Sequence, residues 1–305
     1  MSLKEKLKRS QADYWNLAFI EGGFDVICKN KEVNFIWLKH KYTDRWFADP
    51  FILSVDEKQI VVLVEEFRYD NPVGRIAKLI IGRHSYELLS MEVLLDLPTH
   101  LSFPFIYRKG DSVYIIPENS QSGASYIYKY DINSDTLGVI KAIVRTPLTD
   151  ATICNYKNRE YLVATKLPNP NGNEMLVFEW NDDELKAETD NYHVIRFSGD
   201  YARNAGAVFE YNGIIVRPAQ DCNKVYGGGV VFHSFSPNEK DDSNFERFVS
   251  LYPQSFVYNQ GIHTFNQLAD LAVVDGRGFY KPFLGRIVYY LFSLYNTVRR
   301  IFNNT

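Results

Sequence analysis

Short apolar runs alternate with polar turns along this chain, and the pattern repeats. In one run, Gln59–Val64, five apolar residues follow a polar one. Such runs, bounded by turn residues such as Asn212-Gly213, are typical of β-strands. A strand, a loop and a second strand recur at a pitch of about 50 residues, a length typical of a propeller blade. The copies open at residues 47–51, 101–104, 150–152, 203–206 and 261–264. The pattern predicts an all-β, five-bladed β-propeller.

The repeats divide the chain into one domain of residues 1–282, without an internal linker. Residues 1 to about 15 are predicted as a basic helical lead-in. The last copy lacks partners, and the apolar run 33–38 is predicted to complete its sheet, because propellers often close with strands from both ends of the chain. The predicted blades lie near residues 47–97, 100–147, 149–200, 203–255 and 261–280.

The end of the chain has a different pattern. Apolar residues recur at helical spacing in residues 283–302, and Arg286, Arg299 and Arg300 are the only charged residues there. This spacing predicts a short amphipathic helix within residues 283–305, too interrupted to span a bilayer. One interpretation packs the helix across the propeller. The other lays it on an anionic membrane surface, which would give the protein a peripheral membrane contact.

Composition narrows the class of partner. The net charge of −3 gives no reason to expect a nucleic-acid partner, because binding to phosphates requires a basic surface. Aromatic residues make up 15% of the chain, which suits β-strands and also suits stacking on sugar rings. The first residues lack the apolar core of a secretory signal. We therefore expect a cytoplasmic protein, with a peripheral position on the inner membrane as the alternative.

Propeller geometry predicts where the polar residues of each copy gather. The two strands of a hairpin run antiparallel, so the start of the first and the end of the second share one edge. Radial blades bring these edges to one face around the axis. The polar residues at those points are Asp49, Glu65, Glu66, Glu118, Asp150, Arg203, Asn204, Arg217, Gln220, Asp221, His263 and Asp275.

Several of these residues are carboxylates, and glycosidic chemistry uses such groups around one pocket. Asp49 lies within an apolar run, where an acid is costly unless it is paired or faces a cavity. Glu118 follows Pro117, and an apolar setting would raise its pKa as a proton donor needs. The predicted catalytic residues are Asp49, Asp150, Glu118 and Glu66. Because Glu65 and Glu66 point to opposite faces of a strand, only one of them can face the channel.

The remaining residues supply donors for a substrate. Arginine pairs with carboxylate or phosphate groups, although ion pairs between blades are the structural alternative. His263 can bind a sugar, orient a carboxylate, or hold an axial ion or water, and no other cofactor is implied. No spacing of ligands amounts to a zinc site. The predicted substrate-binding residues are Trp46, His100, Arg203, Asn204, Arg217, Gln220, Asp221 and His263.

These motifs together resemble one family, the N-terminal propeller-like domain of the glucosamine inositolphosphorylceramide transferases and its bacterial relatives. The resemblance covers roughly residues 40–280. It is carried in order by WFADPF (46–51), HLSFP (100–104), IPE (116–118), DAT (150–152), RNAG (203–206), RPAQD (217–221), YG (226–227) and GIHT (261–264).

That domain is in turn similar to the five-bladed propellers of arabinanases and β-xylosidases. The resemblance implies a general base at Asp49 and a pKa-modulating acid at Asp150. Those enzymes take their proton donor from a glutamate on a later blade than the one that bears Glu118. In this chain the corresponding motif ends in Gln220.

Three functions follow from these observations. Glycosyl transfer in the assembly of an envelope polysaccharide or glycolipid is favoured, with a carbohydrate, sugar phosphate or glycolipid as substrate. A glycoside hydrolase of the furanosidase-like propeller type, with Asp49 as base and Glu118 as acid, is the first alternative. A propeller that binds glycans without catalysis is the second.

Overall fold

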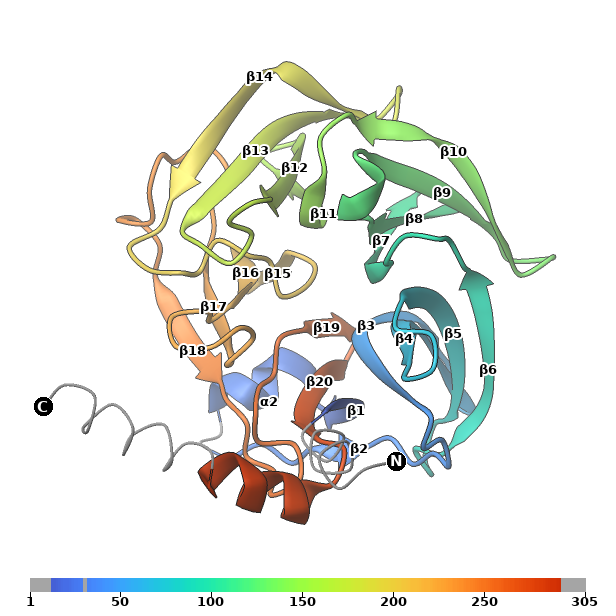
Figure 1. Cartoon of the computed structure of the whole chain (residues 1–305). Helices are drawn as coiled ribbons and strands as arrows, with labels where there is room; N and C mark the ends of the chain where they lie inside the picture. Colours follow the sequence, from blue (N-terminus) through green and yellow to red (C-terminus); the bar gives the residue numbers. More distant parts are fainter. Residues whose placement is uncertain (1–11, 30–31, 292–305) are drawn as a thin grey trace, which may run out of the picture.

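The computed structural model describes residues 12–29 and 32–291 of the 305-residue chain. Five four-stranded antiparallel sheets stand around a central axis (Figure 1). The prediction of a five-bladed β-propeller with a short C-terminal helix is confirmed.

The first three blades each use consecutive strands. The first blade contains β3 (Arg45–Val55), β4 (Gln59–Arg68), β5 (Gly74–Gly82) and β6 (Leu88–Leu95). The second contains β7 (Ser102–Lys109), β8 (Ser112–Glu118), β9 (Ser125–Asp131) and β10 (Thr136–Val144). The third contains β11 (Leu148–Tyr156), β12 (Arg159–Lys166), β13 (Glu174–Asn181) and β14 (Lys186–Arg196).

The last two blades finish the circle. The fourth contains β15 (Phe209–Tyr211), β16 (Ile214–Gln220), β17 (Val230–Ser234) and β18 (Arg247–Leu251). The fifth has the order β19, β20, β1, β2, so strands from both ends of the chain share it. Its strands are β19 (Phe265–Leu268), β20 (Leu271–Phe279), β1 (Asp13–Glu21) and β2 (Ile36–Trp37).

The closure differs in detail from the predicted one. The partner of β20 is β1, which runs antiparallel to it from Asp13 to Glu21. The predicted complement at 33–38 supplies only the short β2, on the outer side of β1. The predicted helical lead-in was wrong for residues 13–15, which are extended, and residues 1–11 lie outside the described part. The tyrosine, tryptophan and phenylalanine of β1 suit a buried strand better than a solvated helix.

Burial follows position in the blade. The second strand of the first blade, β4, is buried from Ile60 to Glu66, whereas its outer strand β6 has no buried residue. Inner strands are covered on both faces by neighbouring blades, so they read as continuous apolar runs. This explains why the repeats are easiest to recognise near the axis.

A bulge recurs in the innermost strand of the first three blades. Asp49, Phe103 and Asp150 have φ angles of 51°, 44° and 46°, and the strand register shifts at each of them. Bulges re-aim side chains, and left-handed conformations of residues other than glycine are costly. Asp49 and Asp150 therefore each lie at a bulge in the innermost strand of a blade.

Within residues 12–29 and 32–291, three helical segments accompany the sheets. They are α2 (Gly23–Lys29), η1 (Ser120–Ser122) and the C-terminal helix, which is described over residues 282–291. Pro282 suits the first turn of the last helix, since its missing N–H would have no helical partner there. Among the described residues, no helix has the length and apolar content needed to cross a membrane. The rest of the predicted helix, residues 292–305, lies outside the described part, so the domain division at residue 282 stays a prediction.

Candidate functional site

Hydrogen bonds from neighbouring residues hold Asp49 in place. The Thr264 hydroxyl donates to Oδ1 at 2.7 Å, and the amide of Phe103 donates to Oδ2 at 3.1 Å. Its own amide donates to Oδ2 of Asp275 at 3.1 Å. Burial raises the pKa of Asp49 to about 7; the positive charge of His263 opposes this, while Glu65, Asp150 and Asp275 add to it. Asp49 is connected to Asp150 through Tyr226, whose ring contacts both His263 and Arg203, the partner of Asp150.

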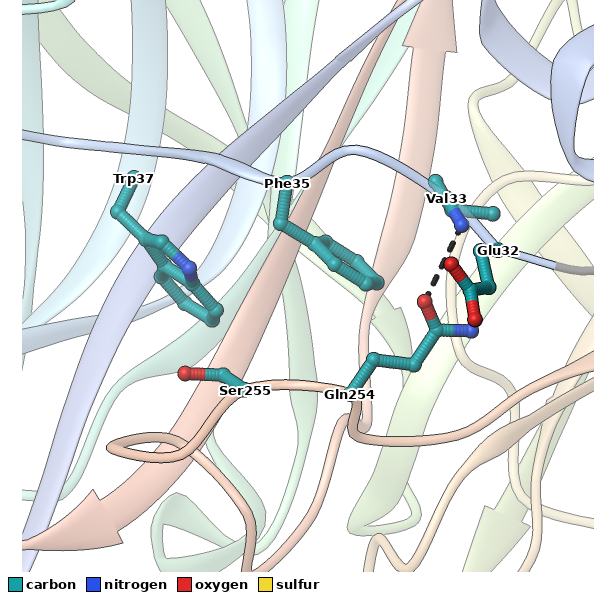
Figure 2. Close-up of a pocket in the computed structure, with 6 residues that line it drawn as sticks. All are labelled: Glu32, Val33, Phe35, Trp37, Gln254 and Ser255. Carbon is teal, nitrogen blue, oxygen red and sulfur yellow. Dashed lines mark hydrogen bonds between the residues drawn. The ribbon is translucent and has the colours of Figure 1, made fainter.

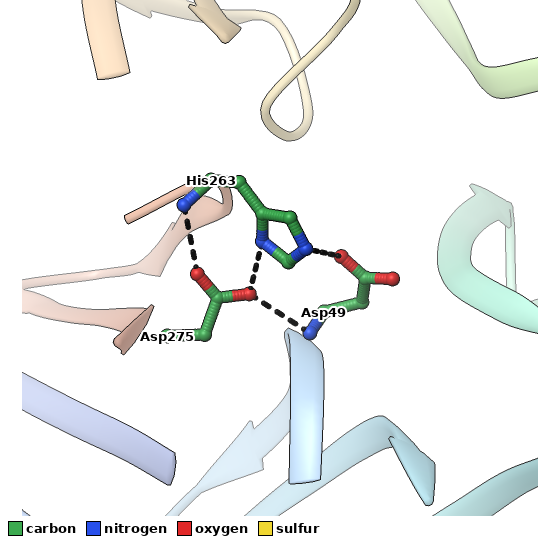
Figure 3. Close-up of side chains that lie close together, drawn as sticks. All are labelled: Asp49, His263 and Asp275. Atoms are coloured by element: carbon green, nitrogen blue, oxygen red, sulfur yellow. Dashed lines mark hydrogen bonds and ion pairs between the residues drawn. The ribbon is translucent and has the colours of Figure 1, made fainter. Parts of the chain in front are cut away.

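His263 forms a charged triad with Asp49 and Asp275, shown in Figure 3. Its Nδ1 lies 2.6 Å from Oδ2 of Asp275, and its Nε2 lies 3.7 Å from Oδ1 of Asp49. The ring stacks on Trp15 with 4.1 Å between centroids. Burial lowers the pKa of His263, but the charges of Asp275 and Asp49 outweigh it and raise the pKa to about 9. At neutral pH the imidazole is therefore a cation.

The same three residues offer ligand atoms within 4.8 Å of one another, so we tested whether they suit a metal ion. A protonated imidazole has no lone pair for a metal. The carboxylate of Asp275 already accepts the amides of His263, Thr264 and Asp49. In the structure the three residues form a charged, hydrogen-bonded triad, and His263 would have to lose a proton before it could bind a metal. The predicted axial ion or water near His263 stays a prediction.

The second half of the axial site surrounds Asp150. Arg203 donates from Nε to Oδ2 of Asp150 at 2.6 Å, and Gln220 donates from Nε2 to the same oxygen at 2.9 Å. Oε2 of Glu118 accepts the Asp150 amide at 3.3 Å and lies 3.5 Å from Nη2 of Arg203. Burial and the charge of Asp150 raise the pKa of Glu118 well above its usual range, against the pull of Arg203. The raised pKa favours the protonated form of Glu118 relative to an ordinary glutamate.

Tyr226 covers this group from the loop between β16 and β17. Its ring faces the Arg203 guanidinium at 4.9 Å and meets the His263 ring edge-on at 5.4 Å. Gly227 follows with a φ of 59°, and a Cβ there would lie 2.6 Å from Cβ of His263. Only glycine lets the loop approach His263 so closely. We call Asp49, Glu118, Asp150, Arg203, Gln220, His263 and Asp275 the axial cluster.

A cavity of about 430 Å³ adjoins the axial cluster between the first and fifth blades. His263 and Tyr226 line the cavity and also contact the axial cluster, whereas Asp49 and Asp150 do not line the cavity. Trp46 stacks on Phe67 with 4.6 Å between centroids. We call this cavity the aromatic pocket. Its lining residues are Ala12, Asp13, Trp15, Trp46, Ala48, Glu65, Phe67, Tyr69, His100, Tyr226, His263 and Arg277.

Glu65 gives the aromatic pocket a carboxylate. Only 5% of this residue is exposed, and Oε1 lies 3.2 Å from Nε2 of His100. The two atoms are at ion-pair distance but not in hydrogen-bond alignment, so Oε1 has no hydrogen-bond donor within the described chain. Nδ1 of His100 accepts the amide of Gly74. Burial lowers the pKa of His100, but Glu65 outweighs it and raises that pKa.

Glu66, the neighbouring predicted acid, is placed elsewhere. Its oxygens pair with Arg45 at 2.9 Å and Arg75 at 2.7 Å, and its side chain is fully buried. It does not line the aromatic pocket. Strand alternation therefore directs Glu65, not Glu66, to the cavity.

Three predicted substrate contacts are engaged within the fold. Arg217 donates to the carbonyls of Tyr201 and Ala202 and to Oδ1 of Asn204, and burial lowers its pKa to about 9. Asn204 donates to the carbonyl of Asp150 at 2.8 Å, which ties neighbouring blades together. Asp221 accepts the hydroxyl of Tyr252 at 2.7 Å.

Of the residues that line the aromatic pocket, only Trp46, His100 and His263 were among the predicted site residues. Trp15 belonged to the predicted helical lead-in, and Arg277 lay within the last predicted blade without a predicted role. The apolar run after Asp13 was the available signal for Trp15. A further cavity of about 410 Å³ (Figure 2) lies between the chain near Phe35 and the segment at Gln254, with Glu32 as its one acid. It contains none of the predicted site residues.

Comparison with known proteins gives one family. A family model described as the N-terminal region of glucosamine inositolphosphorylceramide transferase 1 matches residues 36–249. The transferase 1 of Oryza sativa subsp. indica is 24% identical over 208 residues, which cover 66% of this chain and 28% of that protein. The Arabidopsis thaliana transferase 1 is 30% identical over 191 residues, 60% of this chain and 24% of that protein. The chain thus matches about a quarter of the length of these relatives.

Solved structures share the fold at low identity. A GH43 β-xylosidase/α-arabinofuranosidase from a compost microbial metagenome, in complex with xylotriose and calcium-free, has a TM-score of 0.55 and 12% identity. That match covers 79% of this chain and 93% of that one. A GH43_1 enzyme from Xanthomonas citri has a TM-score of 0.51 and 11% identity, covering 77% and 88%. These matches show the fold alone.

Proposed function

This chain belongs to the family of the glucosamine inositolphosphorylceramide transferase 1 N-terminal domain, and on that premise we propose that it is an enzyme acting at a glycosidic bond. The substrate class is a sugar carried on a glycolipid or phosphate, and the reaction is glycosyl transfer. The single observation that carries the proposal is that one axial cluster contains two carboxyl groups with raised pKa values. Burial raises the pKa of Glu118 well above its usual range and the pKa of Asp49 to about 7.

The proposed roles follow from these pKa shifts. Asp49 is the general base, because a base with a pKa near the working pH is most effective. Glu118 is the general acid, because it keeps a proton to donate to a leaving oxygen. Asp150 lies beside Glu118 and raises its pKa, while Arg203 and Gln220 orient Asp150. Trp46, His100 and His263 line the entry side, where an aromatic face and polar groups can hold a sugar.

A movement of Tyr226 is part of this proposal. The aromatic pocket ends at Tyr226 and His263, so a substrate held there reaches Asp49 only if Tyr226 moves aside. The tyrosine is on a loop that contains Gly227, Gly228 and Gly229, and glycines permit such a change.

The second candidate is a glycan-binding propeller without catalysis. A specific observation favours it: carboxylates of Asp49, Asp275 and Glu118 each accept a backbone amide from the next blade, at Phe103, Asp49 and Asp150. Such bonds explain buried acids by blade-to-blade cohesion alone. Hydrolysis by Asp49 and Glu118 and a cytoplasmic location stay predictions.

The substitution Asp49→Asn tests the enzyme proposal. Turnover is measured with UDP-linked hexosamine donors on phosphatidylinositol vesicles and, for hydrolysis, with xylotriose. We expect turnover to fall at least about 100-fold, because loss of a general base costs that much, while sugar binding persists. Asp183→Asn, at a fully exposed carboxylate that lies 3.9 Å from Lys109, is the matched control.

Two outcomes would reject the enzyme proposal. One is equal turnover by Asp49→Asn and wild type, with unchanged thermal unfolding. The other is wild-type protein that binds these sugars and turns over none of them, which would establish the glycan-binding candidate instead.

A further inference from the structure

The C-terminal helix has an apolar face that no described residue covers. Gly285 and Val288 are buried on its inner side, where Tyr289 also approaches Phe279. On the outer side five large apolar residues span a stripe of about 120°, counted at 100° for each residue. Between 40% and 73% of each is exposed: Phe283, Leu284, Ile287, Tyr290 and Leu291.

A neighbouring loop extends this apolar face. Phe256, between β18 and β19, is 66% exposed, and the Arg286 guanidinium lies 3.9 Å from its ring centroid. Two guanidinium nitrogens of Arg286, Nε and Nη2, are buried and have no hydrogen-bond partner within the described chain. An unpaired cation beside exposed apolar side chains suits a surface that meets anionic lipid headgroups and acyl chains together. Isolated exposed apolar residues are ordinary, but a contiguous face of this kind marks an interaction site.

The charge of this region differs from that of the chain as a whole. The chain has a net charge of −3, yet residues 276–305 contain five basic residues and no acidic one. Lys281 and Arg286 form no ion pair with any residue that the structure describes. A basic, apolar surface is complementary to an anionic bilayer and is a poor match for a second copy of an acidic protein.

A short segment joins the helix to the aromatic pocket. Arg277 lines the pocket, and the helix begins five residues later at Pro282. Between them, Tyr280 packs edge-on against Tyr69, another lining residue, with 5.2 Å between centroids. Figure 1 shows the helix at the outer edge of the fifth blade. Because so few residues separate the two, a surface that binds the helix would hold the pocket nearby.

We propose that the apolar face of the C-terminal helix, with Phe256 and Arg286, docks on an anionic lipid bilayer and brings the aromatic pocket to the membrane surface. The docking follows from exposure and charge. Its consequence, that the pocket receives the sugar headgroup of a lipid held in that bilayer, rests on the proposed function.

The test is co-sedimentation of the full chain with vesicles of phosphatidylcholine alone and of a phosphatidylcholine–phosphatidylglycerol mixture. We expect binding to the mixed vesicles that weakens as salt is added, because exposed charges are screened. The double variant Phe283→Asp/Ile287→Asp should bind at least about tenfold more weakly, since two negative charges replace apolar side chains that would enter the bilayer. Ile132→Asp, at a 78% exposed residue of the second blade, should bind as wild type does.

The proposal is overturned if wild type ignores both vesicles, or if the double variant binds as tightly as wild type. It is also overturned if light scattering without lipid shows a wild-type dimer that becomes a monomer in the double variant, because the face then binds a second copy. Equal thermal unfolding of variant and wild type, together with lost vesicle binding, supports it. Sugar binding measured without vesicles separates the two proposals. Wild-type protein that binds vesicles but no sugar retains docking and loses the proposed function. A double variant that binds sugar but no vesicles shows that the two activities are independent.

Discussion

The axial cluster and the aromatic pocket share a wall but use their carboxylates in opposite ways. In the axial cluster each of Asp49, Glu118 and Asp275 accepts a backbone amide from the neighbouring blade. In the pocket, Oε1 of Glu65 lies near His100 but has no hydrogen-bond donor among described residues. The carboxylates of the first region are engaged by their own fold, and the carboxylate of the second keeps acceptor capacity for a ligand.

This difference teaches that burial alone does not distinguish a structural acid from a binding one. Asp49 and Glu65 are both 5% exposed. What separates them is the number of internal donors that each carboxylate already has, because a satisfied buried group gains little from a ligand. The axial acids must therefore exchange internal partners for substrate during any reaction, whereas Glu65 need not.

The largest expected difference between the two regions is the loss of unfolding free energy when a carboxylate is neutralised. Asp275→Asn removes the negative charge beside His263, and breaking a buried ion pair costs about 3–5 kcal/mol of unfolding free energy. Glu65→Gln should cost less, because the Glu65 carboxylate has His100 as its one partner, whereas Asp275 has His263 and three backbone amides. Urea unfolding of both variants measures the difference. Equal losses would mean that the pocket is as much a part of the fold as the axis.

The next effect is a pH dependence that His263 gives to the axial cluster. The folded pKa of His263 is about 9, above its usual 6.5, so the bound proton stabilises the folded state. This stabilisation is complete below pH 6.5 and is lost as pH rises through 9, by on the order of 3 kcal/mol. Unfolding free energies measured across that window should show the decline in wild type and in the exposed-residue control His84→Gln. A His263→Gln variant with the same decline would contradict the assignment.

The smallest effect sharpens the role of the pocket. Trp46→Ala removes an aromatic wall that stacks on Phe67, and loss of about 1–1.5 kcal/mol of ring contact corresponds to roughly tenfold weaker sugar binding. Isothermal titration with xylotriose measures it. Tyr192→Ala, which removes a 48% exposed aromatic residue of β14, is the control and should bind unchanged. Unaltered affinity in Trp46→Ala would place the sugar elsewhere.

Adjacent residues show how far the sequence could be followed. The alternation of β4 required Glu65 and Glu66 to face opposite sides, but it could not say which side holds the cavity. That depended on Arg45 and Arg75, which come from β3 and β5 and enclose Glu66. Likewise, Asp49 and Asp150 could be placed at strand starts, but the bulges that re-aim them appear only as backbone angles.

The sequence by itself determined the five repeats, the position of the polar residues at one end of the hairpins and the apolar helix near the end of the chain. These features depend on local periodicity, which a single strand or helix carries alone. Tertiary structure decided that β1 closes the fifth blade, that Arg217 is locked in the fold and that Trp15 and Arg277 border the pocket. Those outcomes depend on contacts between residues far apart in the chain, whose geometry no local pattern contains.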